Sequence, residues 1–356
     1  MRRTDTLILG GGPAGSAAAI TLARAGQRPL LLERQRETGD ALCGGFLSWH
    51  SLARVNDLGV RLDGHVVEEV RLYSPRNFAR APLPAPALGV SRRHLDTALL
   101  SQAEALGAKV ERGVAAREAE GSQVRVEGET FAAQRLLLAT GKHDLRGLAR
   151  PKPRRDPALG LRVRLGPSVA LTRLVGGAVE LHLFDRGYAG LVLQEDGTAN
   201  LCLAVRKSRL AEAGDPAALL DAIGRESPAL GERLGHVRSD APIDAIGAVP
   251  YGWRTADTVD GVYRLGDQAA VIPSLAGEGM GIALASGVMA ADAVLRGPPA
   301  AEFQRRLAAR TRRPVTIARA VLALAERPKS AALMTYLTRV APTLADLVAR
   351  ATRIGH

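Results

Sequence analysis

Short, uninterrupted apolar runs separated by glycine-containing turns dominate the first third of the chain. Residues 6–9 (Thr-Leu-Ile-Leu) and 29–32 (Pro-Leu-Leu-Leu) are typical of strands buried on both faces of a parallel sheet. Between them, residues 13–25 are rich in alanine and leucine and predict a helix that ends at Gly26. The pattern therefore predicts a strand–helix–strand unit at the start of the chain.

Later segments continue this mixture of buried strands and helices. Residues 92–106 predict a second helix, residues 122–131 alternate as in a hairpin, and residues 135–141 predict a third buried strand. A connector rich in proline and arginine, 150–157, leads into a β-rich stretch over residues 159–205, which predicts an antiparallel sheet. Two lobes are therefore expected, one built on parallel strands and one on antiparallel strands.

The C-terminal half returns to the first lobe before it ends in helices. Residues 210–234 predict helix, residues 246–251 lead back, and residues 262–293 predict a strand, a turn and a long helix. The predicted fold class is α/β: a Rossmann-type three-layer lobe, a lobe with an antiparallel β-sheet, and a helical C-terminal tail. The first lobe is assigned residues 1–150 and 246–295, the second residues 151–245, and the tail residues 296–356.

Composition narrows the class of protein and its surroundings. Apolar residues make up 46% of the 356 residues and charged residues 24%, as in an ordinary globular protein. The sequence contains no run of about 18 apolar residues, so no membrane span is predicted. Cys43 and Cys202 are the only cysteines, too few for a disulfide framework or a structural zinc site. With no signal-peptide pattern, a cytoplasmic location and no bound metal are expected.

The net charge of +12 is concentrated in the tail. From residue 301 onward, ten arginines and one lysine face three acidic residues, which places +8 there. Aromatic and basic residues do not interleave, and neither a helix-turn-helix nor a zinc-finger pattern occurs, so a nucleic-acid partner is not expected. The simplest explanation is an arginine-rich composition, and the alternative is a membrane surface or acidic partner for the tail.

The tail also carries an apolar stripe whose members recur at alternating spacings of four and three, as on one face of a helix. Pro342 interrupts it. One interpretation, which we favour at this point, is a helix that covers the core or a substrate tunnel. The other is an interfacial helix that meets anionic lipid. The stripe consists of Leu333, Leu337, Val340, Leu344, Leu347, Ala351 and Ile354.

The first candidate for chemistry is the sequence G-G-G-P-A-G that begins at Gly10, which fits the pattern G-x-G-x-x-G. Gly10 would make the tight turn, Gly12 would let a pyrophosphate approach the backbone, and Gly15 would let the helix pack closely on the strand. The free N–H groups at the helix start attract phosphates. Glu33 ends the next predicted strand, where an acid accepts hydrogen bonds from ribose hydroxyls. Together they predict a bound dinucleotide.

A second glycine-rich segment lies about 255 residues downstream. A predicted strand ends in Gly266-Asp267, and Gly279-Met280 opens a helix shortly afterwards. This segment resembles the second FAD signature of the flavoprotein superfamily that contains geranylgeranyl reductases and aromatic-ring hydroxylases. The resemblance implies that Asp267 approaches the ribityl and pyrophosphate part of FAD and that the helix start lies beside the isoalloxazine. A helix N-terminus there would stabilise the negative charge of reduced flavin.

Further segments resemble the same superfamily. Arg92 begins an Arg-x-x-Leu-Asp helix start, the Thr140-Gly141 turn resembles the one over the ADP moiety, and Val114 matches a backbone contact to adenine. Cys43-Gly44-Gly45 resembles the turn that geranylgeranyl reductases place near flavin and substrate. The resemblance implies that FAD contacts Gly10, Gly12, Pro13, Ala14, Gly15, Glu33, Arg34, Cys43, Gly44, Gly45, Arg92, Val114, Thr140, Gly141, Gly266, Asp267, Gly279 and Met280.

Several departures limit the resemblance. Residues 187–193 replace the Tyr-x-Trp-x-Phe-Pro pattern of typical geranylgeranyl reductases, which weakens the case for a prenyl substrate. The Asp-Gly motif that hydroxylases use for FAD and NAD(P)H is reduced to Asp144 and Arg146, which weakens the case for direct NAD(P)H use. The halogenase Trp-x-Trp-x-Ile-Pro pattern is missing. No catalytic residue is assigned, because His50, His94 and His143 are more simply explained as structural or surface residues.

The function that the resemblance implies is an FAD-dependent oxidoreductase for a hydrophobic small molecule, isoprenoid- or polyketide-like, similar to geranylgeranyl reductases. One alternative is a flavin monooxygenase that uses NAD(P)H and O2. An alternative of another class is a flavin-binding partner protein without turnover. The oligomeric state and the electron donor stay open.

Overall fold

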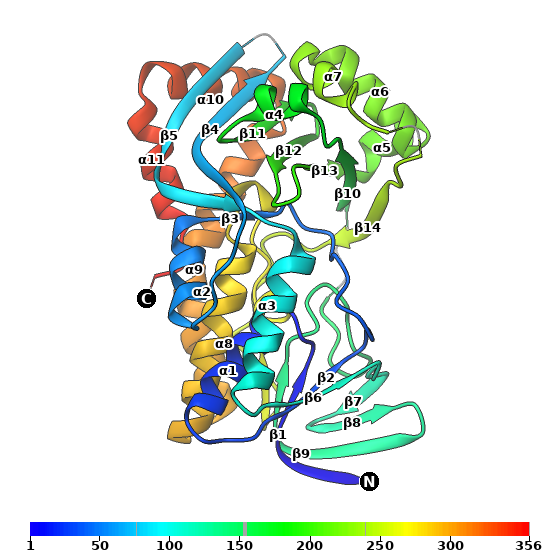
Figure 1. The fold of residues 1–356 in the computed structure, drawn as a ribbon, viewed down its shortest axis with the longest axis vertical. Helices are drawn as coiled ribbons and strands as arrows, with labels where there is room; N and C mark the ends of the chain where they lie inside the picture. Colours follow the sequence, from blue (N-terminus) through cyan, green and yellow to red (C-terminus); the bar gives the residue numbers. More distant parts are fainter. Residues whose placement is uncertain (76, 152–154, 239, 356) are drawn as a thin grey trace.

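The computed structural model describes residues 1–75, 77–151, 155–238 and 240–355, which form two lobes built on two sheets (Figure 1). The predicted connector 150–157 thus includes residues outside the described ones. In the lower lobe of Figure 1, the strands run in the order β6 (Lys109–Arg112), β2 (Leu30–Glu33), β1 (Arg2–Leu9), β9 (Glu129–Leu138), β8 (Gln123–Val126) and β7 (Glu118–Glu120), with β15 (Val262–Arg264) paired to the end of β9.

Both faces of the parallel part of this sheet are buried, which explains the uninterrupted apolar runs. Ile8 and Leu31 face a core formed with helices α1 (Pro13–Arg24), α3 (Arg92–Ala105) and α8 (Gly279–Arg296). Leu7 faces the opposite core, which the β7–β8 hairpin covers through Val124 and Val126. The three-layer arrangement predicted from the sequence is confirmed. Helix α8 alone among the described helices is long and apolar enough to span a membrane, and 61% of it is buried in this core.

The second sheet is antiparallel except for one parallel pair, β4 with β11. One edge of this sheet is the strand over residues 244–249, and the other edge is the two-residue strand 46–47. The order is β14 (Asp244–Val249), β10 (Ala158–Leu165), β13 (Ala199–Arg206), β12 (Gly187–Leu193), β11 (Ala178–Phe184), β4 (His65–Ser74), β5 (Asn77–Gly89) and β3 (Phe46–Leu47).

The composition of this sheet corrects two assignments made from the sequence. Residues 46–89 were given to the first lobe, but their strands β3, β4 and β5 complete the second sheet, next to helix α2 (Trp49–Asp57). Residues 246–251 were also given to the first lobe, but most of them belong to β14, which pairs with β10. The three prolines inside β5 disguised that strand, because proline cannot donate to a β-ladder.

Helices cover both faces of the second sheet. Short helices α4 (Val169–Val175), α5 (Lys207–Ala213), α6 (Pro216–Glu226) and α7 (Pro228–Leu234) lie on one side. On the other side, α9 (Ala300–Ala325) and α10 (Pro328–Val340) bury Leu322 and Ala331 with residues of β12 and β13. Helix α11 (Pro342–Ala351) follows at the outside of the lobe (Figure 1).

The helical tail is confirmed, but most of its apolar stripe is not buried. Leu333 is 55% exposed and Leu347 is 63% exposed, whereas Ile354 at the end of the stripe is fully buried. The favoured interpretation, a helix that covers the core through this stripe, therefore holds only for its last residue. Helices α10 and α11 instead pack on β5 through their other faces.

A buried charged cluster joins the second sheet to α7. Both carboxylate oxygens of Glu180 accept hydrogen bonds from Arg233, each at 3.0 Å, and one is 3.1 Å from His182 Nε2. Burial alone would raise the pKa of Glu180, but the bonds to His182 and Arg233 outweigh it and lower the pKa to about 2. Charge pairing inside the lobe therefore stabilises the folded state at neutral pH.

Glu180→Gln is expected to lower the free energy of unfolding by about 3 kcal/mol near neutral pH, because it removes the buried carboxylate bonded to Arg233 and leaves this arginine paired with the more exposed Glu232. Since the folded pKa is depressed, the stabilisation is present above the ordinary carboxyl pKa and is lost as the pH falls towards about 2. Urea denaturation near pH 7 and near pH 3 measures the difference, which should shrink in acid. Glu212→Gln, at an exposed pair with Arg186, is the matched control. Equal losses of unfolding free energy in Glu180→Gln and Glu212→Gln would contradict the stabilising role assigned to the buried Glu180–Arg233 pair.

Candidate functional site

The glycine turn after β1 has the geometry that the motif predicts. Gly10 has a φ of +104°, and an ideal Cβ there would lie 2.5 Å from the Ala139 carbonyl oxygen. An ideal Cβ on Gly15 would lie only 1.9 Å from the Gly10 carbonyl oxygen. Gly12 is the N-cap of α1, and Pro13 occupies the first helical position. Only glycine at positions 10 and 15 lets the helix start this close to the strand end.

Glu33 lies against this turn. One carboxylate oxygen accepts from the Gly11 N–H at 2.7 Å and the other from the Gln35 N–H at 2.9 Å. The Val114 N–H donates to the Glu33 carbonyl oxygen at 3.0 Å, so this N–H is used within the protein. Arg34 is exposed beside them. Glu33 and Val114 are therefore adjacent, and their contacts with ribose and adenine stay a prediction.

Arg92 brings α3 to the same turn. Its Nη2 is 3.3 Å from the position of an ideal Cβ on Gly12 and 2.6 Å from the Asp96 carboxylate. The Asp40 carboxylate accepts from the Arg92 N–H at 2.9 Å and thereby caps the start of α3. A guanidinium beside the phosphate-binding turn is well placed to hold a pyrophosphate.

The two glycine-rich motifs meet in space. Gly266 has a φ of +51°, and an ideal Cβ there would lie 3.5 Å from the Ala14 Cβ. Helix α8 approaches α1 closely because Gly287 has no side chain: a Cβ there would lie 2.2 Å from the Ala14 carbonyl oxygen. Within the described part of the chain, no hydrogen bond or ion pair engages the half-buried carboxylate of Asp267, which leaves it available to a ligand.

The Thr140-Gly141 turn is tied to this second motif by side chains that the sequence did not single out. Gln268 Nε2 donates to the Gly141 carbonyl oxygen at 2.8 Å. The buried Arg150 donates to the carbonyl oxygen of Asp267 at 3.0 Å and to that of Lys142 at 2.9 Å. Gln268 reaches Gly141 and Arg150 reaches Asp267 from more than a hundred residues away, which leaves no local pattern by which to find these contacts.

The Cys-Gly-Gly turn lies at the junction of the two lobes. The Cys43 carbonyl oxygen accepts from Asn200 Nδ2 at 2.8 Å and from the Cys202 thiol at 2.9 Å, both on β13. Lys142 Nζ donates to the neighbouring Leu42 carbonyl oxygen at 2.6 Å. Burial raises the pKa of Cys202 to about 12, so this thiol stays neutral and acts as a donor.

The start of α8 rests on a buried ion pair with the end of the chain. Glu278, the N-cap residue, is fully buried, and its carboxylate lies 2.6 Å from Arg353 Nη1 and accepts from the Ile354 N–H at 3.1 Å. Burial raises the pKa of Glu278, and Arg353 opposes that rise. The helix start at Gly279-Met280 is therefore held in place by the last turn of the tail.

These residues fit an extended dinucleotide. At Gly44, Gly141 and Gly279 an added Cβ would meet no atom within 4 Å, and at Gly12 it would meet only Arg92. The backbone is therefore open at one glycine in each of the four segments that the motifs bring together. With the helix N-termini, Arg92 and Glu33, these open positions suit FAD.

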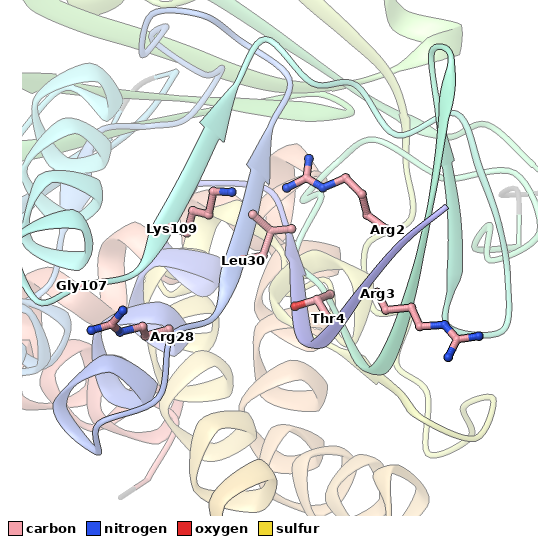
Figure 2. Close-up of a pocket in the computed structure, with 7 residues that line it drawn as sticks. All are labelled: Arg2, Arg3, Thr4, Arg28, Leu30, Gly107 and Lys109. Atoms are coloured by element: carbon pink, nitrogen blue, oxygen red, sulfur yellow. The ribbon is translucent and has the colours of Figure 1, made fainter.

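A surface hollow of about 540 Å³ lies elsewhere, at the opposite end of β1 from Gly10 (Figure 2). Arg2, Arg28 and Lys109 line it, and Figure 2 shows Arg3 pointing away from Arg2. Arg2 is already paired with Glu111 at 2.6 Å. Since the carboxyl ends of parallel strands bind the cofactor in such folds, we do not assign the cofactor to this hollow.

Two tyrosine hydroxyls meet on the face of the second sheet that α9 and α10 cover. Tyr188 and Tyr251 each place their hydroxyl 2.5 Å from Ser274 Oγ, in the loop that precedes α8. Burial raises the pKa of Tyr188 well above its ordinary value and that of Tyr251 to about 12, so both keep their protons at neutral pH. Their spacing in the sequence gave no sign of this cluster.

The other candidates are occupied differently. Asp144, the remnant of the Asp-Gly motif, pairs with Arg150 at 2.7 Å, and Arg146 lies 3.7 Å from Glu118. Burial lowers the pKa of His143, which favours its neutral form. His94 is the third residue of α3, with its N–H bonded to Ser91 Oγ at 3.0 Å.

Comparisons with known proteins agree with this site. The FAD binding domain family matches residues 3–136. Digeranylgeranylglycerophospholipid reductase 2 of Methanopyrus kandleri is 28% identical over 331 residues, which cover 85% of this chain and 80% of that protein. Menaquinone reductase of Mycolicibacterium smegmatis is 28% identical over 319 residues, 83% of this chain and 77% of that protein.

Solved structures share the fold. The flavin-dependent brominase Bmp2 has a TM-score of 0.77 at 16% identity, over 98% of this chain and 93% of that chain. A geranylgeranyl bacteriochlorophyll reductase-like protein from Thermoplasma acidophilum has a TM-score of 0.70 at 18% identity, over 98% and 100%. The FAD-binding domain and the reductase relatives support an FAD-dependent oxidoreductase. The protein is a flavin-dependent enzyme whose relatives include reductases of the geranylgeranyl type.

Proposed function

We propose that the protein reduces a carbon–carbon double bond in an isoprenoid-like lipid. The observation that carries this proposal is the position of the Cys43–Gly45 turn, between Arg92 of the flavin lobe and Asn200 and Cys202 of the second sheet. Relatives at 28% identity that are named reductases of digeranylgeranylglycerophospholipid and menaquinone support the substrate class.

In this proposal the substrate lies on the face of the second sheet that carries Tyr188. Leu72, Leu183 and Ala204 surround Tyr188 there and exclude water from an apolar chain. FAD, when bound and reduced, would supply a hydride to one carbon of the double bond, and the other carbon would take a proton from a positioned hydroxyl. Gly190 lies two residues after Tyr188 and therefore on the same face of β12, where it has no side chain to take up space beside the tyrosine.

The protein's own contribution is to hold a proton beside this face. The hydroxyls of Tyr188 and Tyr251 both lie 2.5 Å from Ser274 Oγ, which links them, and tyrosine hydroxyls carry their protons at neutral pH. A positioned hydroxyl of this kind can donate a proton to a substrate carbon in the transition state. The Asp144–Arg150 pair occupies the remnant of the nicotinamide motif, so we propose that NAD(P)H is not the direct donor.

Anaerobic reoxidation tests the proposal. FAD-loaded protein is photoreduced, mixed with menaquinone or a geranylgeranyl lipid, and followed by flavin absorbance and by mass spectrometry of the lipid. A gain of two hydrogens per flavin oxidised is the expected result. Oxygen incorporation in air with rapid NAD(P)H oxidation would instead establish the monooxygenase alternative. Absence of turnover with every substrate and donor would favour the non-catalytic flavin-binding alternative.

Tyr188→Phe is expected to slow lipid reduction by about 100-fold, because it removes a hydroxyl that holds the proton. FAD affinity should not change, because Tyr188 lies on the second sheet and not in the glycine turns. The matched control is Tyr263→Phe, which removes a hydroxyl that donates to the Pro298 carbonyl oxygen at 3.2 Å, outside the cluster. Single-turnover rates measure the step directly. A Tyr188→Phe rate equal to that of the control would remove the cluster from the mechanism.

A further inference from the structure

The outer faces of α10 and α11 expose a row of large apolar side chains. On α10, Leu333 and Val340 are 55% and 56% exposed, and the spacing of the row is that of one helix face. On α11 the row continues at the same kind of spacing. We call this row the apolar face; it comprises Leu333, Tyr336, Leu337, Val340, Leu344, Leu347 and Val348.

The apolar face is not needed to hold the helices in the fold. Both helices pack on β5 and on each other; α10 fully buries Ala331 and Thr335 on its opposite side, whereas α11 has no buried residue. Figure 1 shows the two helices on the outside of the upper lobe beside β5. Contiguous exposed apolar surface of this size marks a binding surface in a soluble domain.

The charges around the apolar face select an anionic partner. Arg327, Lys329 and Arg339 are exposed on or beside α10, and the Arg339 guanidinium lies 5.4 Å from the centre of the Tyr336 ring. Asp346 is the sole acidic residue of the two helices, and Arg350 pairs with it at 3.0 Å. Basic side chains that border an apolar helix face, with a tyrosine among them, are typical of helices that lie in a membrane interface.

We propose that the apolar face docks the protein on a bilayer that contains anionic lipid. Apolar side chains enter the acyl boundary while Arg327, Lys329 and Arg339 contact the headgroups. Docking also explains how the lipid substrate reaches the protein, a point that rests on the proposed function. The buried side of α10 contacts the cluster that contains Tyr188 and Tyr251, so a single helix separates the bilayer from the sheet face where we propose that the substrate binds.

Vesicle co-sedimentation of the full-length, FAD-loaded protein tests the docking. Binding is expected to vesicles of phosphatidylcholine with phosphatidylglycerol and to be much weaker with phosphatidylcholine alone. The triple variant Leu333→Ser, Leu337→Ser, Leu347→Ser should bind at least about tenfold more weakly. The matched control changes three exposed apolar residues elsewhere: Val169→Ser, Val259→Ser and Leu295→Ser. Arg339→Gln should cost about fivefold on anionic vesicles only.

Two results would overturn the docking proposal. One is vesicle binding that is absent or is the same for the triple variant and its control. The other is a stable dimer that the triple variant alone converts to a monomer, which would make the apolar face a contact between two copies of the chain. Lipid reduction in detergent separates the two proposals. Turnover in detergent without vesicle binding refutes docking alone, and vesicle binding without turnover refutes the proposed reaction alone.

Discussion

Gly15→Ala is expected to weaken FAD binding by at least about 100-fold. The added Cβ would lie 1.9 Å from the Gly10 carbonyl oxygen, a backbone atom that cannot rotate away. The methyl group therefore separates the first turn of α1 from the end of β1, and overpacking of this kind costs about 3 kcal/mol. The same backbone presents the N–H groups that bind phosphate, so the distortion acts on FAD affinity, where about 3 kcal/mol corresponds to about 100-fold.

Two companion variants separate ligand effects from folding effects. Gly12→Ala adds a Cβ that meets only Arg92 Nη2, at 3.3 Å, so it should lower FAD affinity while the apoprotein keeps nearly its normal stability. Gly247→Ala in β14, where nothing lies within 4 Å, should change neither quantity. FAD titration by flavin fluorescence and thermal unfolding of the apoprotein measure them. Normal FAD affinity in both Gly12→Ala and Gly15→Ala would rule out this turn as the pyrophosphate site.

Arg353→Ala is expected to lower the free energy of unfolding by about 3–5 kcal/mol, because it removes the guanidinium paired at 2.6 Å with the buried Glu278 carboxylate and leaves it with the weaker interactions of His50, 4.0 Å away, and Arg54. The same guanidinium also donates to the carbonyl oxygens of Ala276 at 2.6 Å and Gly277 at 3.1 Å. Burial already raises the pKa of Glu278, and without Arg353 that pKa rises further. In the variant, the stability that protonated Glu278 allows is present at low pH and is lost as the pH rises through its folded-state pKa. The loss of unfolding free energy relative to the unchanged protein should therefore be smaller in acid.

Urea denaturation near pH 8 and near pH 5 measures this dependence. Arg350→Ala is the matched control, since Arg350 pairs only with Asp346 on the surface and should cost little. Arg353→Met combined with Glu278→Gln removes both charges and should recover most of the lost stability. A deficit that does not vary with pH, or that the double variant does not recover, would mean that the ion pair is not its source.

The sequence predicted the glycine turn after β1 and the position of Glu33 because their requirements are local. Gly10 needs a φ of +104° for the turn itself, Gly15 lies against the Gly10 carbonyl oxygen, and Glu33 ends the strand paired to β1. The order of strand, turn and helix then fixes where each motif lies in an α/β sheet. The second motif could be placed beside the first only through the resemblance, and the contact between Gly266 and Ala14 shows them together.

The rest of the candidate site depends on contacts between segments that are far apart in the sequence. Tyr188 and Tyr251 come together through Ser274, and Arg150 and Gln268 each bind a backbone carbonyl more than a hundred residues away. No spacing in the sequence encodes such contacts. The exposure of the tail stripe was equally hidden, because periodicity gives a helix two faces and does not say which of them the core takes.

The division of strands between the sheets limits how the enzyme can be taken apart. Strands β3, β4 and β5 leave the flavin lobe, complete the second sheet and return, and the 40–45 segment is bonded from both lobes by Arg92, Arg162 and Lys142. Neither lobe is therefore a self-sufficient folding unit: an excised flavin lobe would carry unpaired strands, and the remaining sheet would lose its edge. New substrate preferences in this scaffold must arise by changes on the existing sheet face rather than by exchange of a whole lobe.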